Sequence, residues 1–342
     1  MGNSLTLTRA VYVNEYVSVL RKIGAPVDKR LDESSLPSNI EEIPQFFVST
    51  PTAINWVAKT GHEINPMELG FLAAQQATVS SLVPVQQAVV MSASSGIKRL
   101  EALIGLLLYE DRSLTVKIEQ NAYYCRVKIT STLQGHRYQC FEEWLNLQSV
   151  ISAMQTVAGA NWAPLEMCFM SHIGASTAVF EAFPNTRILT AQQHTSITIP
   201  NIDLIQTFGK TAATALQQKT SPIVKKLHHE VPRWNLPDYL RSLVKAYLAD
   251  GNLKIDTFAE IAGMSTRSLQ RNLKKNNSSF SQVVQEARFE TACAHLENRS
   301  MKVVDVAIVL GYSNAQNFSR DFRRYSGISP RQYRNQKLYD IH

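Results

Sequence analysis

Cysteine is scarce in this chain, which has four cysteines among 342 residues and no CxxC pair. A disulfide framework and a paired-cysteine metal or redox site are therefore not indicated, and reduced thiols in a cytoplasmic protein are expected. His136, His172 and His194 are isolated and lack the spacing of metal ligands. We expect neither a metal nor another cofactor.

Long apolar runs are also missing. The strongest one, Leu103–Tyr109, is far shorter than the ~20 residues that cross a bilayer. The first residues lack the basic start and apolar core of a signal peptide. We therefore expect a cytoplasmic protein without a membrane partner. A hydrophobic content of 44% argues against global disorder, and the length favours two domains.

A surplus of one charge is absent from most of the chain. Residues 1–231 contain 18 basic and 18 acidic side chains, whereas residues 232–342 contain 17 and 10. The whole net charge of +7 therefore lies in the C-terminal third. This asymmetry predicts two modules with different partners, although a solvated basic face would give the same numbers.

The N-terminal part alternates between helical and strand periodicity, which predicts an α+β domain. Alternating apolar and polar residues predict strands over 114–119 and 123–130, with shorter ones over 165–172 and 194–199. Helical spacing covers 5–23, 44–60, 66–77, 82–92, 96–109, 141–158 and 203–219. Prolines near Thr220–Pro237 indicate a connector. The expected domains are 1–231, with a core of about 15–210, and 232–342.

The C-terminal part carries the sharpest motif. Residues 255–275 combine a short helical stretch, a turn at Gly263, a capping Ser265 and a second helical stretch. Glycine suits the tight reversal, serine caps the second helix, and Leu269 and Leu273 lie on one helix face. This order of parts predicts a helix-turn-helix.

The motif occurs twice. Gly311 follows Gly263 by 48 positions, and the second copy spans residues 306–325. A long helix is expected between the copies over Ser281–Glu297, with inward-facing residues Val283, Val284, Ala287, Ala294 and Leu296. One copy would also fit an ordinary helical hairpin. Two copies with basic residues at matching positions, in the cationic third, favour DNA binding.

At these residues the sequence resembles the DNA-binding domain of AraC/XylS-type transcription regulators. The resemblance covers about residues 235–336 and is most specific at the end, from Gly311-Tyr312-Ser313 to Pro330-Arg331-Gln332-Tyr333-Arg334. A looser resemblance over residues 15–210, including Phe183–Thr186 and Thr198–Asn201, is to the arabinose-binding-type N-terminal domain of the subgroup that includes ornithine-utilisation regulators.

The resemblance implies DNA-contacting positions on both second helices. The base-facing residues would be Arg267, Gln270, Arg271, Ala315, Gln316, Asn317 and Arg320. The residues that follow them would meet phosphates, with an internal ion pair as the alternative for the last: Lys274, Lys275, Arg323 and Arg324.

The resemblance further implies a sequence-specific regulator, expected to be an activator, that binds double-stranded DNA and RNA polymerase. Its N-terminal domain would sense a small-molecule effector, with a homodimer left open. No effector-binding residues can be named, since Arg112, Arg126 and Lys128 also fit solvated strand faces. Two alternatives are a fused enzyme such as a DNA-repair methyltransferase, although no activated-cysteine pattern is present, and a non-specific architectural protein. We expect no enzymatic activity.

Overall fold

The computed structural model describes residues 6–110, 114–205, 235–251, 253–298 and 300–339. The chain forms two compact units. The first, here called the helical unit, comprises Met1–Ala10, Ser35–Ser49 and Arg233–His342. The second, the sheet unit, comprises Val11–Ser34 and Thr50–Pro232. The two units therefore share the N-terminal part of the chain.

The sheet unit is built on a five-stranded sheet in the order β3-β4-β7-β5-β6. All neighbours are antiparallel except β5 and β6. In β4 the side chains of Cys125, Val127 and Ile129 are buried, and those between them are half-exposed, as the alternating sequence predicts. The strands are β3 (Thr115–Gln120), β4 (Tyr124–Thr130), β5 (Glu166–Cys168), β6 (Arg187–Leu189) and β7 (Thr195–Pro200).

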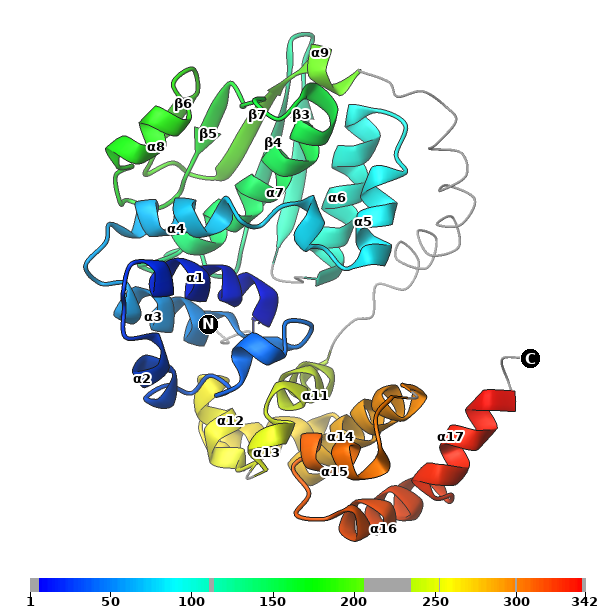
Figure 1. Cartoon of the computed structure of the whole chain (residues 1–342). Coiled ribbons are helices and arrows are strands. Elements are labelled where there is room, and N and C mark those ends of the chain that lie inside the picture. Colours follow the sequence, from blue (N-terminus) through cyan, green and yellow to red (C-terminus); the bar gives the residue numbers. More distant parts are fainter. Residues whose placement is uncertain (1–5, 111–113, 206–234, 252, 299, 340–342) are drawn as a thin grey trace. The chain divides into compact units, whose positions relative to one another are not determined.

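Helices cover one face of this sheet. The central helix α7 (Cys140–Ala158) lies across it and packs against α4 (Pro66–Ala74) and α6 (Gly96–Glu110) (Figure 1). Trp144 and Phe141 on α7 are almost fully buried and supply much of the core. The remaining helices are α1 (Ala10–Lys22), α2 (Val27–Asp32), α3 (Thr50–Thr60), η2 (Val79–Ser81), α5 (Pro84–Met91), α8 (Thr177–Ala182) and α9 (Asn201–Leu204).

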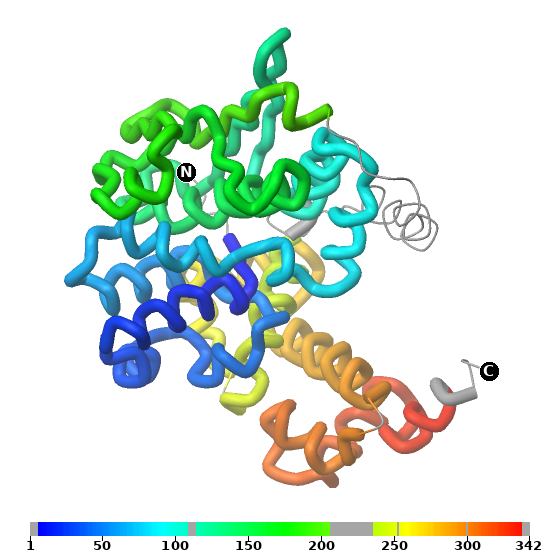
Figure 2. The backbone as a smooth tube through the Cα atoms, turned by 45° about the horizontal axis from the view of Figure 1, so that its top comes forward, coloured from blue at the N-terminus to red at the C-terminus, as the bar shows by residue number. Residues whose placement is uncertain are grey.

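The helical unit contains two helical pairs joined by a long helix, α14 (Phe280–Glu297), drawn in orange in Figure 2. A two-stranded antiparallel sheet of β1 (Leu7–Arg9) and β2 (Phe47–Ser49) belongs to the same unit, and β2 packs beside α11. The helices are η1 (Ile40–Glu42), α11 (Leu236–Ala246), η3 (Leu248–Asp250), α12 (Ile255–Ile261), α13 (Thr266–Lys275), α15 (Val303–Val309), α16 (Ala315–Ser326) and α17 (Pro330–Tyr339).

The fold class predicted from sequence is confirmed: an α+β N-terminal part precedes a helical C-terminal part. Some details were wrong. The helix expected over 5–23 begins only at Ala10, after β1, and the helix expected over 44–60 begins at Thr50, after β2. Ala294 is exposed rather than buried on α14.

Two sequence predictions fall largely outside the described residues. Most of the helix expected over 203–219 lies there, as does most of the connector expected over Thr220–Pro237. The boundary near residue 231 therefore stays a prediction. No helix among the described residues is long and apolar enough to span a membrane.

Candidate nucleic-acid interface

The first helix-turn-helix consists of α12 and α13. Gly263 takes a left-handed conformation, with φ of 63°, which favours glycine at the reversal. Ser265 caps α13 by accepting a 3.2 Å hydrogen bond from the Ser268 N–H. The Thr266 hydroxyl donates a 2.7 Å hydrogen bond to the Asp256 carboxylate on α12. These contacts fix the angle at which α13 leaves the turn.

The second helix-turn-helix, α15 and α16, repeats the backbone hydrogen bonds of the first turn. The Gly311 N–H donates to the Ile308 carbonyl as Gly263 donates to Glu260, each at 2.9 Å. Gly311 is also left-handed, with φ of 74°. The cap falls on Asn314, which accepts a 2.8 Å bond from the Asn317 N–H. The cap lies three positions after the glycine instead of two, so the second turn contains one more residue than the first.

Each second helix is held by an apolar face. Leu269 and Leu273 on α13 are fully buried, and Phe318 and Phe322 on α16 are nearly so. Phe322 also meets the ring of Tyr333 on α17 edge-on, with centroids 5.6 Å apart. Burial of one face leaves the opposite face of each helix free for a ligand.

Ion pairs join α11 to the connecting helix α14. The Arg241 guanidinium contacts Glu286 at 2.9 Å and Glu290 at 3.1 Å, and it also pairs with Asp238 on its own helix at 2.7 Å. Lys245 adds a second bond to Glu290. These side chains are partly buried, so the network is less screened by solvent than an isolated surface pair. It holds α11, the helix that precedes the first helix-turn-helix, against the helix that leads to the second.

The sequence-predicted base-facing residues of α13 are all exposed: Arg267, Gln270 and Arg271. The phosphate candidates Lys274 and Lys275 follow them and are exposed too. Within the described part of the chain, the two arginines and the two lysines make no ion pair. Four cationic groups are thus presented along one short helix.

Helix α16, the counterpart of α13 in the second copy, differs from α13 in its local bonds. Gln316 is exposed, whereas Ala315 and Asn317 are half-buried. The Asn317 amide group donates a 3.3 Å bond to the Ser313 hydroxyl and accepts a 3.4 Å bond from the exposed Arg320. Asn317 therefore bonds to Arg320 in the structure, and a contact from Asn317 to a base would replace these local bonds. Sequence reasoning gave these residues similar roles and did not detect this bond.

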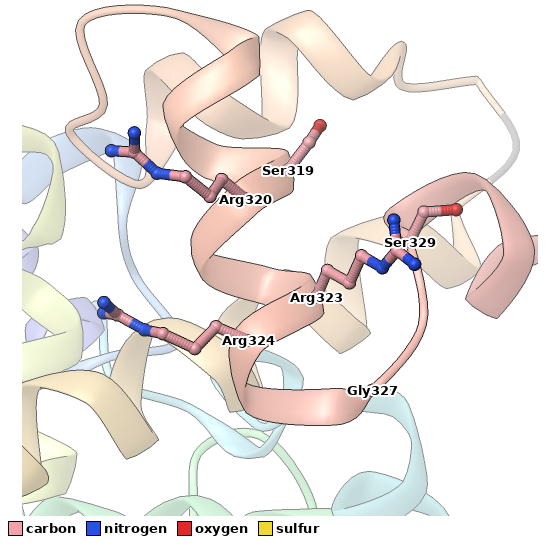
Figure 3. A pocket seen from close by; sticks show the side chains of 6 residues that line it. All are labelled: Ser319, Arg320, Arg323, Arg324, Gly327 and Ser329. Carbon is pink, nitrogen blue, oxygen red and sulfur yellow. The ribbon is translucent and has the colours of Figure 1, made fainter.

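Basic side chains continue along α16 beyond these residues. Figure 3 shows Arg320 and Arg324 projecting on one side of the helix and Arg323 extending toward the loop with Ser329. Together with Ser319 and Gly327 these residues line an open groove of about 600 Å³. Arg324 also approaches Asp321 at 3.5 Å, which is the internal pair that the sequence left as an alternative.

In the sheet unit, two of the cationic effector candidates are paired. Arg126 contacts Glu166 at 2.9 Å, and Lys128 contacts Glu119 at 2.7 Å. Arg112 lies outside the described residues. No group of histidine, cysteine or acidic residues that could hold a metal occurs among the residues searched, which are those the structure describes.

Comparison with known proteins agrees with the geometry. Residues 258–336 match a family model described as a helix-turn-helix domain. The chain is 23% identical over 339 residues to the HTH-type transcriptional regulator VirS of Mycobacterium tuberculosis, covering 96% of each. It is 33% identical over 70 residues to the ornithine utilization regulator of Pseudomonas aeruginosa, covering 20% of this chain and 21% of that one.

A solved structure, the transcriptional regulator CdpR from Pseudomonas aeruginosa, matches with 17% identity and a TM-score of 0.44, covering 90% of this chain and 97% of that chain. The sequence matches and the paired helices lead to one identification. The chain is a transcriptional regulator whose DNA-binding domain is an AraC-type helix-turn-helix domain, matched over residues 258–336.

Proposed function

We propose that the chain is a sequence-specific activator whose helices α13 and α16 read successive major grooves of one double-stranded DNA site. The observation that carries this proposal is the repeated turn: both copies have the same glycine conformation and the same turn hydrogen bond, and both end in an exposed basic helix. A major groove admits one α-helix. Two such helices in one chain suit grooves about one helical turn (~34 Å) apart.

The proposal assigns different tasks along each helix. Arg267, Gln270 and Arg271 near the start of α13 would meet base edges, because arginine fits guanine and glutamine fits adenine. On α16 the base-facing set is Ala315, Gln316, Asn317 and Arg320, in which Ala315 could offer only an apolar contact to a thymine methyl group. Lys274, Lys275, Arg323 and Arg324 would contact phosphates. The exposure of the basic side chains supports these roles.

The sheet unit would bind a small-molecule effector and alter how the helical unit engages DNA and RNA polymerase in the cytoplasm. One feature of the chain supports such coupling. The chain passes between the units after Ala10, Ser34, Ser49 and Pro232, so a change in one unit acts on several segments of the other. By linkage, DNA would then change effector affinity by the same factor. Two chains on neighbouring sites would form a homodimer.

The cysteines argue against the alternative of a fused methyltransferase. Cys125, Cys140 and Cys168 are buried, and burial raises the pKa of Cys140 to about 12. Burial also raises the pKa of Cys125 and of Cys168. A thiol must ionise to act as a nucleophile, so these three sites suit packing instead of methyl transfer.

Genome-wide mapping of binding sites tests the proposal first, because it yields the sequence motif and the neighbouring genes. Matched and scrambled duplexes are then titrated at several salt concentrations. We expect preference for the matched duplex at physiological salt. Equal affinity for both duplexes would favour a non-specific architectural protein.

A further inference from the structure

We propose that strand β3 is a self-complementary dimer edge, which pairs antiparallel with β3 of a second copy of this chain across a twofold axis at Ile118. The pairing would join the two sheets into one continuous sheet. The proposed function includes a homodimer, and this inference names the surface through which its two chains would bind each other. The argument rests on the backbone, the charges and the exposed apolar side chains of one six-residue strand.

Among the described residues, no strand covers the outer backbone edge of β3. β3 is the end strand of the sheet, and in the part of the chain that the structure describes it pairs with β4 alone. At the hairpin, the Asn121 N–H donates a 3.0 Å bond to the Tyr124 carbonyl. In an antiparallel pair the bonding direction alternates along the strand. Lys117 and Glu119 therefore bond toward β4, and the N–H and C=O groups of residues 116, 118 and 120 point outward.

This alternation restricts how two copies can pair. Opposing outward-bonding residues form the hydrogen-bonded pairs of an antiparallel ladder, so Ile118 can face Ile118 of the second copy. Val116 then faces Gln120 of the second copy. In this register the outward-pointing N–H and C=O groups of residues 116, 118 and 120 face those of the second copy, so no backbone change is needed. A twofold axis through the Ile118 pair repeats each contact.

Charge selects this register over its two nearest alternatives. With Ile118 at the axis, Lys117 lies opposite Glu119 of the second copy, and symmetry repeats the pair. The two neighbouring registers, shifted by two residues in either direction, place Lys117 opposite Lys117 or Glu119 opposite Glu119. Opposite charges directly across a ladder stabilise it and like charges destabilise it. Lys117 is exposed and has no ion pair with the described residues, whereas Glu119 is bound only from one side, by Lys128 at 2.7 Å.

The apolar side chains fit the same arrangement. Ile118 is 42% exposed although it belongs to the core-facing side of the strand. Opposite strands place such side chains in contact, so each Ile118 would cover the other. An exposed strand edge with an apolar side chain is otherwise a site of unwanted association. The competing explanation is that the charge of Lys117 serves only to prevent such association, here called a guard role.

A six-residue strand pair is smaller than a standard interface of about 800 Å² per partner. The dimer formed by this edge alone is therefore weak. Binding of two chains to neighbouring DNA sites would raise their effective concentration and favour it. Only this last step depends on the proposed function, and dimerisation is measured without DNA.

Site-directed cross-linking tests the axis directly in the full-length chain. A Cys293→Ser background removes the one cysteine that is not buried. Facing residues in hydrogen-bonded pairs are ~5.5 Å apart at Cα, within disulfide range, so Ile118→Cys should become mostly covalent dimer under mild oxidation. Lys117→Cys is the matched control and should stay mostly monomeric. Greater cross-linking of Lys117→Cys would overturn the register, and cross-linking of neither variant would overturn the edge.

Charge reversal gives an independent readout by sedimentation. Lys117→Glu should weaken dimerisation by about tenfold, because two attractive pairs become repulsive. Adding Glu119→Lys to the same chain restores both pairs and should restore the affinity. A guard role for Lys117 predicts the opposite, stronger association of a variant that lacks the lysine, and that result would overturn the proposal. Unchanged DNA affinity of the isolated monomer in these variants separates this inference from the DNA-reading one.

Discussion

The Tyr247 hydroxyl donates a 2.7 Å hydrogen bond to the backbone carbonyl of Ser35, which lies 212 positions earlier in the chain. Tyr247 follows α11 directly and is almost fully buried. Burial, with a smaller contribution from the Asp250 carboxylate, raises the pKa of its hydroxyl group. The bond ties the segment Ser35–Ser49 to the end of α11, and the DNA-binding unit contains residues from both the N-terminal and the C-terminal part of the chain.

Removing this hydroxyl group should destabilise the helical unit. Tyr247→Phe leaves the ring in place but deprives the Ser35 carbonyl of its donor, which typically costs about 1 kcal/mol. Urea unfolding of the full chain measures the loss. Tyr123→Phe is the control, since Tyr123 is 81% exposed. Equal effects of the two variants would show that the long-range bond contributes nothing.

The second turn packs against η3 and against Gly251, which follows it. A Cβ atom added at Gly311 would collide with the Leu248 carbonyl oxygen and lie 2.8 Å from the Gly251 Cα atom. Gly311→Ala should therefore cost more than the ~1–2 kcal/mol of left-handed strain alone. Gly327→Ala isolates that strain, because Gly327 has a φ of 81° and no heavy atom within 4 Å of the added Cβ. Comparable melting temperatures for the two variants would contradict this packing.

The two turns were predictable because their signals are local. Gly263, Ser265 and Gly311 act through backbone conformation and caps a few residues away, which spacing in the sequence reports. The strands β1 and β2 were missed because three residues give no reliable period. Their pairing also joins residues 7–9 to 47–49, a long-range contact that propensity cannot reveal.

The site was less predictable than the fold. Exposure of Arg267 and Arg271 follows from the helix face opposite Leu269, so sequence spacing was sufficient. The bond from Arg320 to Asn317 depends on side-chain rotamers at the start of α16. Membership of Ser35–Ser49 in the helical unit depends on the tertiary partner that buries it, and no local pattern encodes that.

Acid should weaken the protein through His295 on α14. Burial lowers the pKa of His295 below its usual value, so the unfolded chain binds the proton more tightly than the folded protein. The contribution of neutral His295 to the free energy of unfolding is therefore fully present above ~pH 6.5 and is lost as the pH falls below that value. The urea midpoint of the parent should fall between pH 7.5 and pH 5.5, and the midpoint of His295→Gln should fall less. This role would be excluded if the midpoint of His295→Gln fell as much as that of the parent. It would also be excluded if the exposed control His62→Gln reduced the fall equally.

Base-reading and phosphate-contacting residues on α13 should separate in binding experiments. Arg271→Ala should lose ~1–3 kcal/mol on the matched duplex and relax one base preference. Lys274→Ala should weaken matched and scrambled duplexes alike and reduce the salt dependence. Gel-shift titrations at several salt concentrations measure both. Equal losses for Arg271→Ala on the two duplexes would remove its base-reading role.

The central claim, that α13 and α16 read two successive major grooves, is tested most directly by methylation interference at guanine N7. The parent chain should give two clusters of interference on one DNA face, about one helical turn apart. Arg271→Ala should remove interference in one cluster and Arg320→Ala in the other. A single cluster, or loss of the same positions in both variants, would contradict the account.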